Sequence, residues 1–180
     1  VVMTDAFGPA AFIARVRVVP LRNMGAQMAP MNAFLIMQGI ETLSLRMDRH
    51  CENTQKVAEH LKAHPRVSWV SYAGLPEHPD HAQAKKYLGG RASGILSFGV
   101  KGGYDAGVKF LDALKLVTRL VNIGDAKSLA THPASTTHRQ LNAQELAAAG
   151  VTPDMVRLSI GIENIADILA DIDQALAASA

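Results

Sequence analysis

The sequence predicts an α/β domain in which helices and strands alternate along the chain. Short segments rich in β-branched and aromatic residues, bounded by glycine or proline, are separated by segments whose apolar residues recur at helical spacing. Strands are expected at residues 66–72, 94–100, 118–123 and 155–160. Helices between strands can build a parallel or a mixed sheet, and periodicity alone leaves both arrangements open.

The longest predicted element is a helix over residues 30–64. Pro30 suits a first helical turn, apolar residues recur at near-helical spacing, and His64 followed by Pro65 ends the run. A helix of about 33 residues spans roughly 50 Å, which exceeds the width of a small domain. We therefore expect it to bridge two bodies. The alternative is two helices broken near Gly39.

Shorter helices are predicted around the strands, and two of them have recognisable N-terminal caps. Asn142 caps the helix over residues 143–149, and Asn164 with Asp167 three residues later resembles the capping pair of the last helix. The other helices are expected at residues 79–88 and 104–116.

The start of the chain resembles the interior of a longer polypeptide. It opens at Val1 without an initiator methionine, so we expect that it has been cut from something longer. Residues 10–19 are predicted to form a helical turn or two leading into an extended piece before Pro20.

Composition excludes several classes of protein. The formal net charge is +2 and aromatic residues make up 5%, so the chain has neither the basic stripe nor the stacking surface of a nucleic-acid-binding protein. No apolar run reaches the ~18 residues of a membrane span. The single Cys51 excludes an internal disulfide and a structural zinc cluster, and we expect no metal site. The sequence predicts a soluble, cytoplasmic protein.

Two segments carry the polar groups that a functional site needs. Arg157 stands alone in the otherwise apolar strand segment 156–161, and a guanidinium in that position requires a partner. The segment 122–138 supplies the amide of Asn122, a glycine at Gly124 that permits close backbone approach, and hydroxyls at Ser128, Ser135, Thr136 and Thr137. Together these groups form a candidate carboxylate clamp. The alternative is a structural ion pair between Arg157 and an acidic residue.

The same segments resemble a known enzyme family. N-I-G-D-A-K-S-L-A-T-H-P-A-S-T-T-H at 122–138, V-R-L-S-I-G-I-E from Val156, and L-S-L-R-M-D-R-H-C-E-N at 43–53 are similar to the C-terminal part of the pyridoxal-phosphate enzymes of cysteine and methionine metabolism. The likeness runs from Gly8 to Ala178 and is strongest to O-acetylhomoserine sulfhydrylases. Methionine γ-lyases and cystathionine enzymes are similar here, but usually have serine where this chain has Asn122.

The resemblance implies a particular fold and domain organisation. It implies the C-terminal domain of the aspartate-aminotransferase-like fold type I, with a mixed or antiparallel sheet, helices on one face and a long linking helix before it. Residues 1–29 would then be the tail end of the large cofactor domain and a linker. Residues 30–64 would form the linking helix, and residues 65–180 the substrate-clamping domain.

The resemblance also assigns roles to single residues. Arg157 would bind the substrate α-carboxylate through two parallel hydrogen bonds, and Asn122 would contact the same group, with Thr137 and Ser128 as further substrate-binding candidates. Pyridoxal 5'-phosphate would be bound by a Schiff-base lysine outside this segment, upstream of Val1, so that no catalytic residue is expected here. Lys127 lies in the carboxylate loop and is not that lysine.

For the whole enzyme, the resemblance implies conversion of O-acetyl-L-homoserine and sulfide to L-homocysteine and acetate. Its expected partners are the amino-acid substrate, the N-terminal cofactor domain and further copies in a tetramer, and this segment alone is expected to be inactive. The alternatives are a methionine γ-lyase, a cystathionine γ-synthase or lyase, and a non-catalytic fragment that packs against a partner subunit.

Overall fold

The computed structural model of the chain describes residue 8 and residues 10–180. Residues 1–7 and 9, which begin the predicted tail segment 1–29, lie outside the described residues. The chain divides into two compact units, Val1–Leu43 and Ser44–Ala180, and each is described by itself. Among the described residues, no helix combines the length and the apolar character needed to cross a membrane.

The first unit consists of short helices with exposed side chains. They are α1 (Ala11–Val16), the π-helical turn η2 (Arg17–Leu21), α2 (Arg22–Met24) and α3 (Pro30–Glu41), and none of them contains a buried residue. The extended piece predicted before Pro20 is wrong, because the helix continues through Pro20 inside the wider π-helical turn. Such turns interrupt the regular i→i−4 bonding that a proline cannot complete.

The helix predicted over residues 30–64 is divided in two. After α3, the backbone leaves helical geometry at Thr42 (φ −105°, ψ 7°), and α4 (Leu43–Ala63) begins at the next residue. The prediction of one unbroken helix is therefore wrong, and the alternative of two helices is confirmed, with the break at Thr42, three residues after Gly39. Helix α4 is also part of the second unit's core, since Val57, Ala58 and Leu61 are fully buried there.

A mixed sheet of five strands organises the second unit. The strands are β1 (Val67–Ser71), β2 (Ile95–Val100), β3 (Thr118–Arg119), β4 (Leu129–Thr131) and β5 (Met155–Ser159). They are ordered β1-β2-β5-β4-β3, with the β3–β4 pair parallel and the other neighbours antiparallel. This order confirms the mixed sheet and decides between the two arrangements that periodicity left open.

Two features of the sheet differ from the sequence prediction. The strand expected at 118–123 is shortened to the two residues of β3. Strand β4 was missed because it lies inside the segment 122–138, which has the composition of a loop. Its three residues are all buried, so tertiary pairing with β5 creates a strand that local propensity does not indicate.

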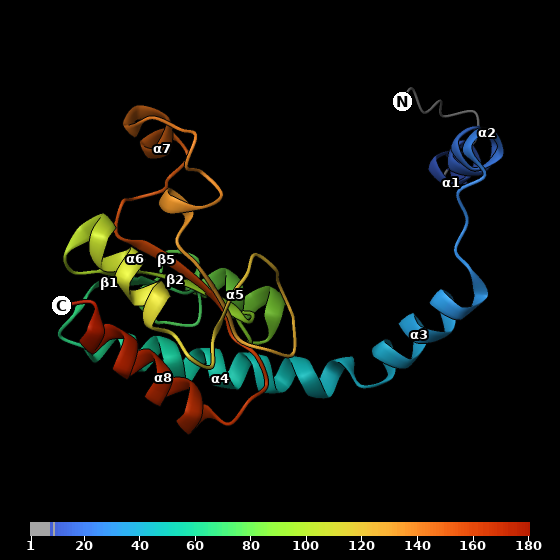
Figure 1. Cartoon of the computed structure of the whole chain (residues 1–180). Helices are drawn as coiled ribbons and strands as arrows, with labels where there is room; N and C mark the ends of the chain where they lie inside the picture. Colours follow the sequence, from blue (N-terminus) through green and yellow to red (C-terminus); the bar gives the residue numbers. More distant parts are fainter. Residues whose placement is uncertain (1–7, 9) are drawn as a thin grey trace. The chain divides into compact units, whose positions relative to one another are not determined.

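Helices cover one face of this sheet. Figure 1 shows α4 and α8 (Ile165–Ala178) side by side, and His60 Nε2 on α4 lies 2.6 Å from Asp173 Oδ1 on α8. Helix α6 (Gly103–Ala113) packs beside α8, and its Phe110 meets Phe98 of β2 edge to face at 5.5 Å. Val156 and Leu158 of β5, and Ile160 directly after the strand, complete the same core with side chains from these helices.

Both predicted N-cap residues, Asn142 and Asn164, cap their helices, but Asp167 does not complete the predicted pair with a side-chain hydrogen bond among the described residues. Helix α7 (Ala143–Ala148) begins with a capping box, in which Asn142 accepts hydrogen bonds from Gln144 N and Glu145 N while Glu145 accepts from Asn142 N. At α8, Asn164 Oδ1 accepts from Ala166 N at 2.9 Å. The remaining helices are α5 (His81–Leu88) and the 3-10 turn η3 (Pro133–Ser135).

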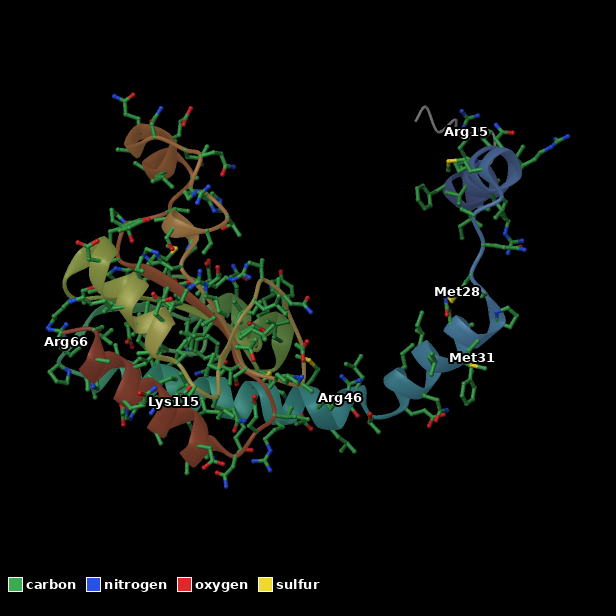
Figure 2. All side chains as sticks on the ribbon, in the orientation of Figure 1. Arg15, Met28, Met31, Arg46, Arg66 and Lys115 are labelled. Atoms are coloured by element: carbon green, nitrogen blue, oxygen red, sulfur yellow. The ribbon has the colours of Figure 1, made fainter. Side chains whose placement is uncertain are left out.

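Asp171 connects α8 to the segment that leads into β3. Its carboxylate accepts hydrogen bonds at 2.9 Å from the backbone N–H groups of Lys115, Leu116 and Val117, and Figure 2 shows Lys115 beside α8. Burial alone raises the pKa of Asp171, but these hydrogen bonds outweigh burial and hold the pKa below its usual value. The buried carboxylate thereby fixes the chain just before the candidate carboxylate loop.

We expect Asp171→Asn to lower the free energy of unfolding by about 1–3 kcal/mol, because the amide cannot accept all of these bonds. A depressed carboxyl pKa stabilises the fold above its unfolded pKa of about 3.9, and this contribution is lost as the pH falls through the folded pKa. Thermal melts should therefore show a large difference between wild type and variant at pH 7 and a smaller one near pH 3. An equal difference at both pH values would contradict the assignment, and exposed Asp167→Asn is the control.

Candidate functional site

Arg157 lies in the middle of the sheet, on the face opposite the helices. Its neighbours along β5, Val156 and Leu158, are fully buried in the core, so the pleat directs Arg157 to the other face. In the antiparallel register, Arg157 lies opposite Ser97 on β2 and Thr131 on β4. Strands β2 and β4 therefore flank Arg157 on its two sides.

Arg157 as a residue is half-buried, and its guanidinium has no protein partner in the part of the chain that the structure describes. It forms neither an ion pair nor a hydrogen bond with residues 8 and 10–180. The alternative of a structural ion pair is therefore not found within the described residues. An unpaired guanidinium on a half-buried residue offers its planar fork of N–H donors to a ligand.

The loop that carries Asn122 lies over the same face of β5. Gly124 N is 3.4 Å from the hydroxyl of Ser159, which is two residues beyond Arg157 and so shares its face. Gly124 has φ +74°, which favours glycine at this turn. Asn122 is exposed, and its Oδ1 accepts a hydrogen bond from Ile123 N at 2.8 Å. The amide Nδ2 of Asn122 is left to donate outward.

Ser128, which the resemblance makes a substrate-binding candidate, is hydrogen-bonded within the chain instead of being open to solvent. The side chain is fully buried. Its hydroxyl donates to Glu163 Oε2 at 2.9 Å and accepts from Gly161 N at 2.8 Å, while its backbone N–H donates to Glu163 Oε1. Because both functions of the hydroxyl are occupied, Ser128 anchors the loop to the segment after β5.

The hydroxyls predicted at residues 135–137 divide into two kinds. Ser135 and Thr136 bond internally to His132, and Thr136 Oγ1 also lies 3.1 Å from Thr131 Oγ1. Thr137 is exposed, and its hydroxyl lies 2.8 Å from Nδ1 of His138. Thr137 is therefore the most exposed of these three hydroxyl residues.

Sequence reasoning missed the two residues that flank Arg157. Ser97 and Thr131 are polar residues that lie beside Arg157 on two different strands, and strand pairing alone brings them together. A sequence signal existed for Ser97, since a serine between Leu96 and Phe98 in a strand must lie on the face opposite these buried side chains. No local signal indicated Thr131, because β4 itself was not predicted.

The chain thus combines a mixed sheet covered by helices on one face with an arginine on the other face that has no partner among the described residues. The family model described as "Cys/Met metabolism PLP-dependent enzyme" matches residues 5–177. This chain belongs to that family.

Curated relatives agree with the family assignment. The chain is 50% identical over 175 residues to O-acetyl-L-homoserine sulfhydrylase 1 of Thermus thermophilus, covering 97% of this chain and 42% of the relative. It is 54% identical over 167 residues to O-acetyl-L-homoserine sulfhydrylase of Leptospira meyeri, covering 92% and 38%. Homocysteine synthase of Schizosaccharomyces pombe is 50% identical over 175 residues, with 97% and 41% covered. The chain thus spans about two fifths of the length of these relatives.

A solved structure confirms the predicted fold class, the C-terminal domain of fold type I. It comes from Campylobacter jejuni, is provisionally named as an O-acetylhomoserine (thiol)-lyase, and contains N'-pyridoxyl-lysine-5'-monophosphate. The TM-score is 0.86 at 45% identity, and the match covers 94% of this chain and 40% of that one.

We expect Ser128→Ala to destabilise the protein without weakening substrate binding. The change leaves Gly161 N without its acceptor in a buried position, which costs about 1–3 kcal/mol. Thermal unfolding should show the loss, whereas KM of the full-length enzyme should stay within about twofold of wild type. Exposed Ser71→Ala is the matched control, for which we expect a smaller change in Tm. A KM that rises strongly for Ser128→Ala at unchanged Tm would return Ser128 to the substrate site.

Proposed function

We propose that this chain is the substrate-clamping part of a pyridoxal-phosphate-dependent enzyme of γ-replacement. The full-length enzyme would convert O-acetyl-L-homoserine and sulfide to L-homocysteine and acetate. The observation that carries the proposal is the unpaired guanidinium of Arg157, a half-buried residue of the sheet below the loop of Asn122. The names of the relatives from Thermus and Leptospira support the choice of substrate.

Arg157 would bind the α-carboxylate of the amino acid. Its planar guanidinium matches a carboxylate in a two-bond, charge-assisted arrangement, which determines the orientation as well as the charge of the ligand. Asn122 Nδ2 would donate a further hydrogen bond to the same group, since its Oδ1 is already used by Ile123 N. Thr137 would line the edge of the site from its exposed turn.

Holding the carboxylate determines how the rest of the substrate is presented. With two carboxylate oxygens bound, rotation about the bond from nitrogen to Cα is restricted, and the Cα–H bond takes one direction relative to the reacting group. Pyridoxal phosphate, when bound, supplies the electron sink for loss of that proton. The described residues fit the substrate side of the reaction, because they offer donors for a carboxylate.

The cofactor-binding lysine is proposed to lie outside this segment, and the segment alone is proposed to be inactive. Lys127 is exposed, and its backbone N–H donates a hydrogen bond to Asp125 Oδ1 within the same loop. Residues 1–29 are proposed to be the tail end of the cofactor domain and a linker, followed by helical residues 30–64 and the clamping domain at 65–180. A cytoplasmic tetramer is proposed as the setting of the whole enzyme.

The exposed apolar side chains of the first unit support the proposal that another part of the polypeptide packs against it. Helix α3 is apolar on all sides, and its Phe34, Leu35 and Met37 are 55%, 60% and 62% exposed. A helix with this composition is normally buried all round. We propose that the remaining part of the polypeptide covers it.

Product analysis of the full-length enzyme tests the reaction. Incubation with O-acetyl-L-homoserine and sulfide should release acetate and homocysteine in equal amounts. Release of ammonia and a keto acid would identify a γ-lyase. In separate incubations, formation of cystathionine from cysteine would identify a cystathionine γ-synthase, and cleavage of added cystathionine would identify a cystathionine lyase. Absence of any turnover would favour the non-catalytic fragment.

We expect Arg157→Lys in the full-length enzyme to reduce kcat/KM strongly. An ammonium group cannot reproduce the planar two-bond fork, and the loss of such a partly buried charged contact costs about 2–5 kcal/mol. Steady-state kinetics with O-acetyl-L-homoserine measure this loss. Exposed Arg49→Lys on α4 is the control, and it should leave kcat/KM unchanged. If Arg157→Lys retains kcat/KM within a few-fold, Arg157 is not the carboxylate ligand.

We expect Asn122 to adjust binding without being indispensable. One neutral hydrogen bond is worth about 0.5–1.5 kcal/mol net, so Asn122→Ala should raise KM several-fold with less effect on kcat. Asn122→Ser keeps a donor and should retain most activity. Melting temperature and KM are measured together for Asn122→Ala. A lowered Tm with an unchanged KM would show that Asn122 has a structural role only.

A further inference from the structure

His132 is a fully buried histidine with a partner on each ring nitrogen. Nε2 lies 2.8 Å from the backbone oxygen of Pro153, and Nδ1 lies 2.9 Å from the hydroxyl of Ser135. The ring also meets Tyr104 edge to face, with centroids 5.2 Å apart. A buried imidazole with this set of bonds has little freedom to rotate.

The hydrogen-bond partners determine the tautomer of His132. Burial is the main cause that lowers its pKa, so the ring is neutral at neutral pH. The carbonyl oxygen of Pro153 can only accept, so Nε2 carries the proton and donates it. Nδ1 is then an acceptor, and the hydroxyl of Ser135 donates to it.

These bonds join the two strands on which the candidate clamp is built. His132 directly follows Thr131, the residue of β4 that lies opposite Arg157. Pro153 lies two residues before Met155, where β5 begins. The ring of His132 therefore connects the end of β4 to the start of β5 across the Thr131–Arg157 pair.

The backbone of His132 organises the turn that carries Thr137. Its carbonyl oxygen accepts hydrogen bonds from Ser135 N at 3.2 Å and from the hydroxyl of Thr136 at 2.8 Å. His132 is thus hydrogen-bonded both to the segment that leads into β5, the strand of Arg157, and to the turn that carries Thr137.

We propose that His132 is a positioning residue for the carboxylate clamp, acting through the strand of Arg157 and the turn of Thr137. This inference rests on the proposed function. The ring itself touches neither Arg157 nor any group offered to the substrate, so its effect is on the geometry of substrate binding.

Gly107 provides an independent way to displace the same ring. A Cβ atom added at Gly107 on α6 would lie 2.5 Å from His132 Nε2 and 2.6 Å from Cδ2. A contact this close cannot be accommodated without movement of the ring, which is held on its other sides by Pro153, Ser135 and Tyr104. Gly107→Ala is therefore expected to displace the ring of His132 without removing any of its polar atoms.

The test compares four variants of the full-length enzyme. His132→Asn keeps an acceptor near the position of Nδ1 but loses the donor to Pro153, and His132→Gln keeps an amide donor that reaches toward Pro153. We expect His132→Asn and Gly107→Ala to lower kcat/KM for O-acetyl-L-homoserine about tenfold, mainly through KM. His132→Gln should recover most of this loss. Phe110→Leu, on the same helix as Gly107, should lower Tm and leave KM unchanged.

The outcomes separate this inference from the proposed function. If the wild type turns over O-acetyl-L-homoserine and Arg157→Lys is impaired, the clamp stands. Unchanged KM in His132→Asn and Gly107→Ala at a lowered Tm would then overturn the positioning role alone. If the wild type has no activity with this substrate, the proposed function fails and the role of His132 in the clamp fails with it.

Discussion

The antiparallel pairing of β5 with both β2 and β4 is the constraint on which the candidate site depends. It buries Val156 and Leu158 against the helices and so directs Arg157 to the opposite face. Strands β2 and β4 flank Arg157 on its two sides, so a partner for its charge has to approach from the face of the sheet opposite the helices. Because β5 is held in register by a neighbour on each side, the guanidinium is presented in a defined position. Binding of a ligand to this guanidinium would therefore require little reorganisation of β5.

A buried polar network fixes the chain on the far side of β5. His50 Nδ1 on α4 lies 2.6 Å from Ile160 O, and Asn53 Nδ2 donates to Gly161 O and Glu163 O at 3.0 Å each. Gly161 must be a glycine here, since a Cβ atom would collide with the backbone oxygen of Ala126. These contacts link α4, the end of β5 and the loop that follows Asn122. The base of the candidate carboxylate loop is thus held by buried hydrogen bonds to α4.

The candidate site could be predicted in part. Arg157 was recognisable because a lone charge in an apolar strand needs a partner, and Asn122 because a donor in a polar segment can serve the same ligand. Asn122 is exposed, and the bond from Gly124 N to Ser159 places its loop over the face of β5 that carries Arg157. Ser128 had the right chemistry, but its hydroxyl is consumed by Glu163 and Gly161. Residue type indicates which bonds a side chain can make, whereas burial decides which of them remain available.

The sequence by itself determined the elements whose signals are local. The capping box of Asn142 and Glu145, the cap at Asn164, and strands β1, β2 and β5 follow from residues within a few positions of one another. Only the tertiary structure decided the strand order and the existence of β4. Strand β4 exists because Leu129 and Ala130 pair with residues of β5 that lie about thirty positions away, and such non-local pairing overrides the loop-like composition of the segment. Periodicity along the chain reports on neighbours in sequence, and it carries no information about which distant strand will be a neighbour in space.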